Sequence, residues 1–259
     1  MSDFAARFGP WAVVTGGAAG MGAAFAADLR SRGLRLLLVD RDAAALADRA
    51  QPEDRALTID LARPGAADEL TAMMDELDVG LLVSNAALSC TGPFLEQGVD
   101  HGLTQLRLNC ELPLRLVHHL LPRLVERGRG GILLVSSLSG MRGTPLEAGY
   151  AATKAWTMIL AESLWDEMRE QGVDVMALLP GTTNTPGFRS ARPQPGLGTG
   201  NVMEPDEVVR EALDALGTRP SIIAGRANRD SEALMASLDR VEAVTTMGRV
   251  MREMFPPDR

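Results

Sequence analysis

The sequence predicts an α/β fold, a doubly wound parallel sheet with helices on both faces. Short apolar runs alternate with longer helical stretches from Trp11 to Leu179, the pattern of strands joined by right-handed helical crossovers. A glycine-rich turn joins the first apolar run to the first helical stretch. Asp40, Asp60 and Asn85 stand where successive apolar runs end, and open α/β sheets bind ligands at that edge.

The predicted strands and helices alternate along most of the chain. Strands are expected at 11–15, 34–39, 56–59, 79–84, 131–136, 173–179 and 221–224. Helices are expected at 21–32, 43–50, 64–77, 99–127, 150–170, 205–216 and 231–254. Pro113 and Pro122 are expected to bend the longest of these, because proline has no N–H to give to a helix.

The stretch 186–201 interrupts this alternation and is rich in proline and glycine. It could link two domains, but no second alternating unit follows it, so we expect a lid over a site. We therefore predict a single domain over residues 1–259, with a helical extension at 229–259. The chain has 259 residues, of which 46% are hydrophobic, enough for one large core.

Charge and composition exclude several classes of function. The net charge is -8 and no basic block occurs, which argues against a nucleic-acid partner. The first ten residues lack the pattern of a signal peptide, and no apolar run approaches the ~18 residues of a membrane span. Cys90 and Cys110 have no metal or redox spacing, so we expect reduced thiols in a cytoplasmic protein. The three histidines lack a zinc pattern, and no metal is predicted.

The turn Thr15-Gly16-Gly17-Ala18-Ala19-Gly20-Met21-Gly22 lies between the first strand and the first helix. Glycines let the backbone approach a pyrophosphate, and a helix N-terminus offers unpaired N–H groups and a favourable dipole. In this strand–turn–helix setting the turn predicts a dinucleotide site. The residues expected to contact the cofactor here are Gly16, Gly20, Met21 and Gly22.

Asp40 ends the second strand, 18 residues after Gly22. A carboxylate there can accept hydrogen bonds from the ribose hydroxyls of NAD and would repel a 2′-phosphate. Arg41 could instead pair with that phosphate, so NAD is expected and NADP is the alternative. Asp40 could also be the N-cap of the following helix.

Two further strand ends extend the predicted cofactor site. Asp60 and Leu61 follow the third strand, where the adenine is expected. Asn85 and Ala86 follow the fourth and are expected to form the floor of the site. Asn85 could equally serve only the turn.

The chain contains one tyrosine, Tyr150, and one lysine, Lys154. Residues four apart share a helix face. An ammonium within ~4–6 Å favours phenolate and lowers a phenol pKa from about 10, which makes tyrosine a usable acid or base. The alternative is a partly buried tyrosine beside a surface lysine. Ser137 ends the fifth strand 13 residues before Tyr150, which places a hydroxyl near the phenol.

Together these features resemble the short-chain dehydrogenases/reductases over about residues 11–224. The resemblance is carried by the glycine turn with Thr15, Asp40, Asp60, Asn85, Asn109, Ser137, the Tyr150–Lys154 pair and Pro180-Gly181. It implies a Rossmann-type domain that binds a nicotinamide dinucleotide. One departure is Ala87, where the family usually has glycine, and we expect cofactor binding to survive it.

The resemblance also implies roles for the catalytic residues. Tyr150 exchanges a proton with the substrate oxygen, and Ser137 orients that oxygen. Lys154 lowers the tyrosine pKa and holds the nicotinamide ribose. Asn109 anchors a water that links Lys154 to solvent. At the nicotinamide end the resemblance adds Pro180, Gly181 and Thr185.

The leading expectation is an oxidoreductase that moves a hydride between NAD(H) and a secondary alcohol or ketone. An epimerase or dehydratase that retains its cofactor, and a non-catalytic dinucleotide-binding protein, are the alternatives. The segment 8–11 and the C-terminal helix resemble the branch containing reductases of hydroxysteroids and long acyl chains, which suggests an apolar substrate. Arg189 and Arg192 in the lid could bind an anionic tail or be solvated. The helices around Asn109 and Tyr150 are expected to pair in a homodimer or homotetramer.

Overall fold

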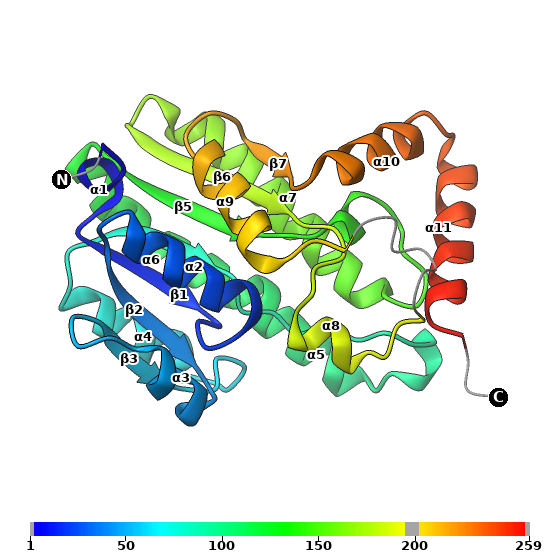
Figure 1. Ribbon diagram of the computed structural model, residues 1–259, viewed down its shortest axis with the longest axis horizontal. Coiled ribbons are helices and arrows are strands. Elements are labelled where there is room, and N and C mark those ends of the chain that lie inside the picture. The colour runs from blue at the N-terminus through cyan, green and yellow to red at the C-terminus, as the bar shows by residue number, and fades with distance from the viewer. Residues whose placement is uncertain (1–2, 195–201, 257–259) are drawn as a thin grey trace.

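The structure, a computed structural model, describes residues 3–194 and 202–256. Its described residues contain a sheet of seven parallel strands in the order β3-β2-β1-β4-β5-β6-β7 (Figure 1). The strands are β1 (Trp11–Thr15), β2 (Arg35–Asp40), β3 (Arg55–Thr58), β4 (Val79–Ser84), β5 (Gly130–Val135), β6 (Val173–Leu179) and β7 (Ser221–Ile223). The predicted doubly wound sheet is confirmed, and its strand order reverses between β1 and β4. Such a switch point opens a crevice at the carboxyl ends of the strands.

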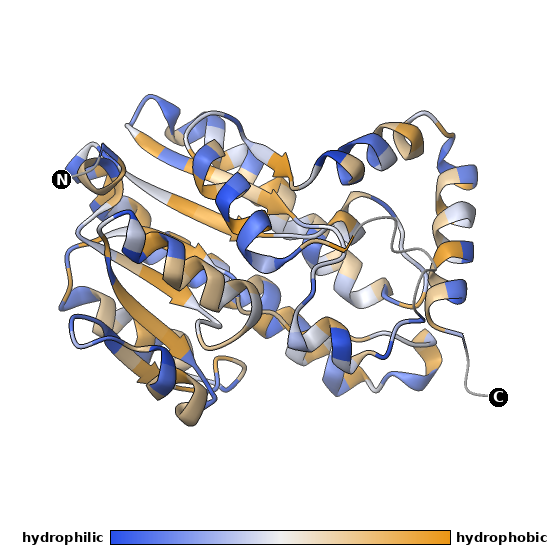
Figure 2. Ribbon diagram, viewed as in Figure 1, coloured by the Kyte–Doolittle hydropathy of each residue, from blue (hydrophilic) through white to orange (hydrophobic). Residues whose placement is uncertain are grey.

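Helices cover both faces of the sheet, because alternate strand side chains point to opposite sides. Val14 packs in one core and Val13 in the other, and both are fully buried. Most of the strands are accordingly hydrophobic (Figure 2). The first core is covered by α1 (Asp3–Phe8), α2 (Gly20–Ser31), α3 (Ala43–Arg49) and α9 (Pro205–Ala215). The second is covered by α4 (Ala66–Asp75), α6 (Leu112–Arg127) and α7 (Ala148–Arg169).

The helical region predicted over 99–127 is continuous but is not α-helical throughout. It consists of α5 (Val99–Leu106), a π-helical turn η2 (Arg107–Glu111) and α6. Pro113 has no N–H for the carbonyl of Asn109, its i−4 partner, so regular α-helical bonding cannot continue there. That carbonyl instead accepts a hydrogen bond from the hydroxyl of Thr157 at 3.4 Å. Pro122 lies inside α6 without ending it.

The single helix predicted over 231–254 is wrong, because two helices occupy this region. They are α10 (Arg226–Ala236) and α11 (Arg240–Met254), which extend beyond the carboxyl end of the sheet (Figure 1). Asp239 accepts a hydrogen bond from the Glu242 amide at 2.8 Å, and Glu242 accepts one from the Asp239 amide at 3.3 Å. This capping box starts a new helix and explains the break.

Three short turns of helix are η1 (Phe94–Glu96), η3 (Leu138–Met141) and α8 (Pro186–Ser190), of which η3 and α8 line the larger cavity described below. The expected lid therefore begins as α8, capped by Thr185, whose hydroxyl accepts a hydrogen bond from the Phe188 amide at 3.2 Å. The Gln194 amide donates to the carbonyl of Met254 at 2.8 Å and joins this segment to the end of α11. Residues 195–201 of the expected lid lie outside the described residues.

Asp42, and not Asp40, caps α3, since its carboxylate accepts a hydrogen bond from the Ala45 amide at 3.0 Å. The N-cap expectation for Asp40 is therefore wrong, and its side chain is available elsewhere. None of the described helices is both long enough and apolar enough to cross a bilayer.

Candidate active site

Two cavities lie side by side at the carboxyl ends of the strands. The larger, of about 830 Å³, has Ser137, Tyr150 and Lys154 in its wall and is bordered by α8, α10 and α11. The smaller, of about 360 Å³, lies beyond the ends of β2, β3 and β4. Asn85 and Ala87 line both cavities, so an extended ligand can pass from one to the other.

Ser137 and Tyr150 meet in the larger cavity. Ser137 lies two residues beyond the end of β5 and caps η3, where its hydroxyl oxygen accepts a hydrogen bond from the Ser139 amide at 3.1 Å. Tyr150 lies in the first turn of α7 and is hydrogen-bonded to the Ser137 side chain. The two segments converge because Gly140 packs against α7. A Cβ at position 140 would lie 2.7 Å from the backbone of Lys154 and Ala155.

In the protein without a cofactor, the pKa of Tyr150 is raised overall and not lowered as the sequence led us to expect. Burial raises the pKa of Tyr150 well above its ordinary value, the charge of Glu147 acts in the same direction, and the Ser137 hydrogen bond opposes both. The Lys154 ammonium nitrogen lies 5.6 Å from the centre of the Tyr150 ring and donates to the Val135 carbonyl at 2.7 Å. Burial also lowers the pKa of Lys154 to about 8. Tyr150 is therefore a neutral phenol near pH 7, suited to giving a proton.

Asn109 lies behind these residues and lines neither cavity. Its carbonyl oxygen accepts a hydrogen bond from the Leu88 amide at 2.9 Å. Its amide group donates to the Leu88 carbonyl at 2.9 Å and to the Thr153 hydroxyl at 3.0 Å. Asn109 thus ties the loop after β4 to α7 at the turn that carries Tyr150 and Lys154. Its expected water relay stays a prediction.

The glycine turn fits a phosphate-binding role. A Cβ at Gly22 would lie 1.8 Å from the carbonyl oxygen of Gly16, so only glycine lets the first turn of α2 fold this closely onto the loop. The Thr15 hydroxyl accepts hydrogen bonds from the amides of Asn85 and Ala86 at 3.0 Å. The Asn85 side chain donates to the carbonyls of Thr15 and Gly16 at 2.9 and 3.2 Å. Asn85 thus holds the ends of β1 and β4 together at the cavity floor.

Most predicted cofactor residues line one of the two cavities. The smaller cavity is lined by Gly16, Asp40, Arg41, Asp60, Leu61, Asn85 and Ala86. The larger is lined by Met21, Asn85, Tyr150, Lys154, Pro180, Gly181 and Thr185. Gly20 and Gly22 line neither and shape the turn. This distribution fits a dinucleotide whose adenine end occupies the smaller cavity and whose nicotinamide end occupies the larger.

Asp40 faces the glycine turn. Its carboxylate accepts hydrogen bonds from the amides of Ala18 at 3.0 Å and Asp42 at 3.2 Å. Each oxygen keeps acceptor capacity for a ribose hydroxyl. Arg41 beside it is exposed and forms no ion pair with another described residue.

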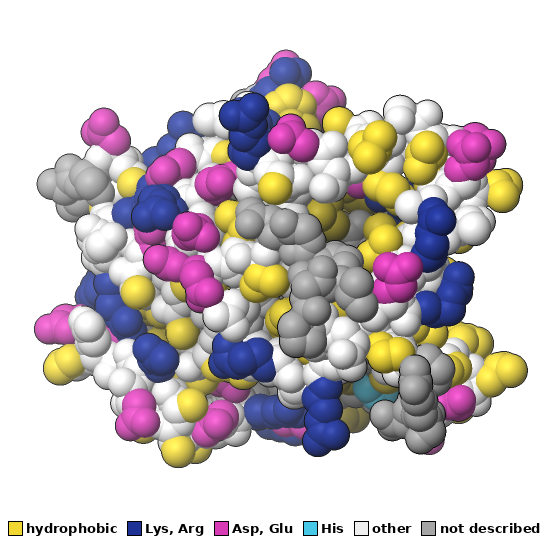
Figure 3. Space-filling view, turned by 45° about the vertical axis from the view of Figure 1, so that its right-hand side comes forward, with side chains coloured by type: hydrophobic (Ala, Val, Ile, Leu, Met, Phe, Trp, Pro, Cys, Tyr) yellow, Lys and Arg dark blue, Asp and Glu magenta, His cyan; other side chains and the backbone are white. Residues whose placement is uncertain are grey.

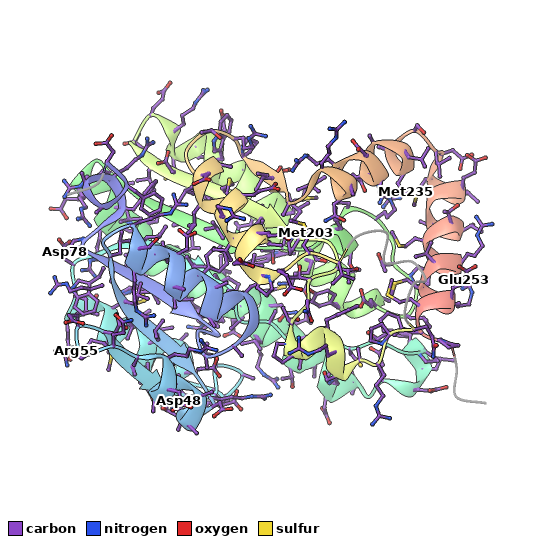
Figure 4. All side chains as sticks on the ribbon, viewed as in Figure 1. Asp48, Arg55, Asp78, Met203, Met235 and Glu253 are labelled. Carbon is purple, nitrogen blue, oxygen red and sulfur yellow. The ribbon has the colours of Figure 1, made fainter. Side chains whose placement is uncertain are left out.

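The outer wall of the larger cavity is apolar and comes from segments for which the sequence predicted no site residues. Met235, labelled in Figure 4, lies on α10 near its junction with α11. The larger apolar residues here, from α10, α11 and the residue after α11, are Leu234, Met235, Met247, Val250, Met251, Met254 and Phe255. Hydrophobic side chains also reach the surface at this end of the molecule (Figure 3). Leu234 on α10 and Val241 on α11 are exposed hydrophobic residues. Arg189 and Arg192 of the expected lid do not line the cavity, and Arg189 donates to the Asn184 side chain at 2.6 Å.

Sequence comparison decides the family. The short chain dehydrogenase family profile matches residues 10–196, well over half of the chain. The chain belongs to the short-chain dehydrogenase family. It is therefore an oxidoreductase that transfers a hydride between a nicotinamide dinucleotide, NAD or NADP, and an alcohol or ketone.

This short-chain dehydrogenase is 30% identical to a 7β-hydroxysteroid dehydrogenase of Clostridium sardiniense over 97% of its own length and 99% of that protein. A solved 7β-hydroxysteroid dehydrogenase structure matches it with a TM-score of 0.87 and 28% identity, covering 95% of this chain and 99% of the other. A short-chain dehydrogenase of Sphingobium yanoikuyae, solved with NADPH, matches it with a TM-score of 0.75 and 29% identity, covering 89% of this chain and 97% of the other.

Proposed function

We propose that this short-chain dehydrogenase interconverts a ring alcohol and the corresponding ketone on a large apolar substrate of the hydroxysteroid class. One observation carries the proposal: Ser137 and Tyr150 interact in the wall of a cavity of about 830 Å³. Apolar side chains of α10 and α11 form the outer wall of this cavity. The similarity to a 7β-hydroxysteroid dehydrogenase spans nearly the whole chain, including these helices, and supports the same substrate class.

The nicotinamide, when bound, supplies or accepts the hydride. Tyr150 gives its phenol proton to the substrate oxygen during reduction and takes it back during oxidation. Ser137 already accepts a hydrogen bond from the Ser139 amide, so its own O–H can orient the substrate oxygen. Lys154, one turn along α7, would stabilise the phenolate that forms. Asn109 holds this turn through Thr153 and, as the resemblance implies, would anchor the water that restores the proton.

We propose NAD as the preferred cofactor. The Asp40 carboxylate lines the cavity assigned to the adenine end, where it would bind ribose hydroxyls and repel a 2′-phosphate. NADP is the second candidate because Arg41 lines the same cavity and lacks an ion-pair partner among the described residues. Dissociation constants for NADH and NADPH decide between them, and tighter binding of NADPH would reverse the assignment.

The function is tested by following NADH absorbance with 7-oxo and 7-hydroxy steroids. Tyr150→Phe should bind NADH nearly as well as wild type but turn over at least ~100-fold more slowly, as expected for a lost general acid. Near-normal turnover by this variant would refute the mechanism. Net conversion without a change in NADH absorbance would favour the epimerase or dehydratase. NADH binding without turnover of any alcohol or ketone would favour the non-catalytic alternative.

We further propose a homodimer or homotetramer that pairs through α5, α6 and α7. Leu106, Leu114 and Ile159 on these elements are 52%, 46% and 55% exposed, and apolar surface of this kind marks interfaces. A light-scattering mass of one chain would refute this. The same proposal includes a single domain over residues 1–259 with a lid at 186–201. It also includes a cytoplasmic location, which the free thiols of Cys90 and Cys110 support.

A further inference from the structure

Glu147 lines the larger cavity beside the proton-donating residue. It immediately precedes α7 and lies three residues before Tyr150. Its charge is close enough to Tyr150 to raise the pKa of the phenol. A substrate whose oxygen meets Tyr150 therefore has other atoms within reach of the Glu147 carboxylate.

Hydrogen bonds from two different segments hold this carboxylate in place. The Ser139 hydroxyl in η3 donates to Oε2 at 2.9 Å, and the Thr91 hydroxyl in the loop after β4 donates to Oε1 at 3.3 Å. The side chain is only partly exposed, and no ion pair holds it among the described residues. Each carboxylate oxygen can accept a second hydrogen bond, so the group is oriented and still has capacity to bind.

The other charges in the cavity wall are accounted for. Arg142 and Glu232 form a two-pronged ion pair and cancel one another. The Lys154 ammonium donates to the Val135 carbonyl. Among the described residues that line the cavity, Glu147 is thus the carboxylate without a cation. An ionised carboxylate only accepts hydrogen bonds and repels anions, so it favours a neutral group that donates a hydrogen bond.

We propose that Glu147 is a specificity-determining residue that binds a second hydroxyl group of the substrate, near the carbon that reacts. This inference rests on the proposed function. The remainder of the substrate packs on the apolar side chains of α10 and α11. A buried acceptor left without a donor disfavours the analogue that lacks the hydroxyl. Ser139 and Thr91 already donate hydrogen bonds to the carboxylate, so the loss of the substrate hydroxyl leaves it only partly unpaired. We therefore expect the hydroxylated substrate to be preferred over the analogue by at least ~10-fold, below the largest preferences known for such sites.

The test uses three probes that differ only in this group: 7-oxo-5β-cholanoic acid and its 3α-hydroxy and 12α-hydroxy derivatives. The quantity measured is kcat/KM for reduction by NADH, expressed as the ratio of each hydroxylated probe to the parent. Wild type should prefer one hydroxylated probe by at least ~10-fold. Glu147→Ala should bring that ratio close to one. Glu147→Gln, whose amide oxygen still accepts a hydrogen bond, should keep part of it.

Glu167→Ala is the matched control, because Glu167 is an exposed glutamate at the far end of the same helix. It should keep the wild-type ratio, since it is remote from the cavity lining. If Glu147 has a purely structural role, Glu147→Ala would lower kcat/KM for all three probes equally and leave the ratio unchanged. That result would overturn this inference but not the proposed function. A wild-type ratio near one for both hydroxylated probes would also overturn it. No turnover of any probe by wild type would overturn the proposed steroid substrate and this inference with it.

Discussion

Arg142 and Glu232 join the catalytic segment to the C-terminal helices. The guanidinium donates from Nη1 to Oε2 at 2.7 Å and from Nη2 to Oε1. Arg142 directly follows η3 and Glu232 lies on α10. Their side chains are only 6% and 11% exposed, so the pair is largely shielded from water. The wall of the larger cavity is thereby tied to the segment that positions Ser137.

Glu232→Leu should destabilise the protein strongly, because it leaves the Arg142 guanidinium buried without a partner. Loss of one member of a buried pair costs about 3–5 kcal/mol. The double variant Arg142→Met/Glu232→Leu should recover most of this, because it removes both charges and keeps similar volume. The free energy of unfolding from urea titration measures both effects. Equal destabilisation by the single and double variants would show that the pair's charges are not what holds this contact.

Gly140→Ala should separate Ser137 from Tyr150. The added methyl would lie 2.7 Å from backbone atoms of Lys154 and Ala155, and backbone cannot yield as a flexible side chain can. Displacement by even about 1 Å can lower turnover on the order of 100-fold. We therefore expect kcat to fall far more than NADH affinity. Gly143→Ala is the control, since its Cβ would meet only Val244 at an ordinary 3.5 Å. Comparable losses of kcat in both variants would contradict this explanation.

Glu147→Gln should stabilise the protein at neutral pH. Burial raises the pKa of Glu147 above its ordinary 4.5, although hydrogen bonds from Ser139 and Thr91 oppose the rise. The unfolded chain therefore loses this proton first, and stability falls as pH rises above about 4.5. Glutamine removes the cost, so the Tm of the variant should exceed that of wild type by roughly 2–4 °C at pH 8 for each kcal/mol recovered. The difference should shrink towards zero at pH 4, and a difference independent of pH would contradict the assignment.

Much of the fold could be predicted because its signals are local. Each strand is a short apolar run bounded by polar residues, and parallel crossovers then fix the layers. The predicted helical region 99–127 is continuous and contains one π-helical turn, because Pro113 cannot bond the carbonyl of Asn109. The single helix predicted over 231–254 was wrong, because Asp239 caps a new helix through Glu242. The spacing of Asp239 and Glu242 was a usable signal for this break.

The site was predictable where residue type and strand ends determine position, as for Asp40 and Tyr150. It was not predictable where segments far apart in the chain meet. The ion pair of Arg142 with Glu232 spans 90 residues, and nothing local marks either partner. Burial is the main cause of the raised pKa of Tyr150, and burial cannot be read from the sequence. The helical spacing to Lys154 therefore predicted the wrong direction for this pKa shift. Nothing local in the sequence marks Glu147, because its hydrogen bonds come from Ser139 and Thr91 on two other segments.

NADH affinity should weaken as pH rises through about 8. Burial lowers the pKa of Lys154 to about 8, and this outweighs the opposing effect of Cys110, so the free protein loses this ammonium charge above that pH. If the ammonium holds the nicotinamide ribose, its loss removes a charge-assisted hydrogen bond of about 1.5–3 kcal/mol, which is roughly 10–100-fold in Kd. Fluorescence titration of NADH between pH 6 and 10 measures this.

Lys154→Arg is the decisive variant, because arginine keeps its charge throughout this range. Its NADH affinity should be lower than that of wild type at pH 7, since the guanidinium has a different shape, but should not change with pH. Cys110→Ala should keep the wild-type pH dependence, because burial raises the pKa of the Cys110 thiol to about 11 and it stays neutral over most of the range. If Lys154→Arg lost affinity with pH as steeply as wild type, another group would be responsible and the cofactor contact assigned to Lys154 would be wrong.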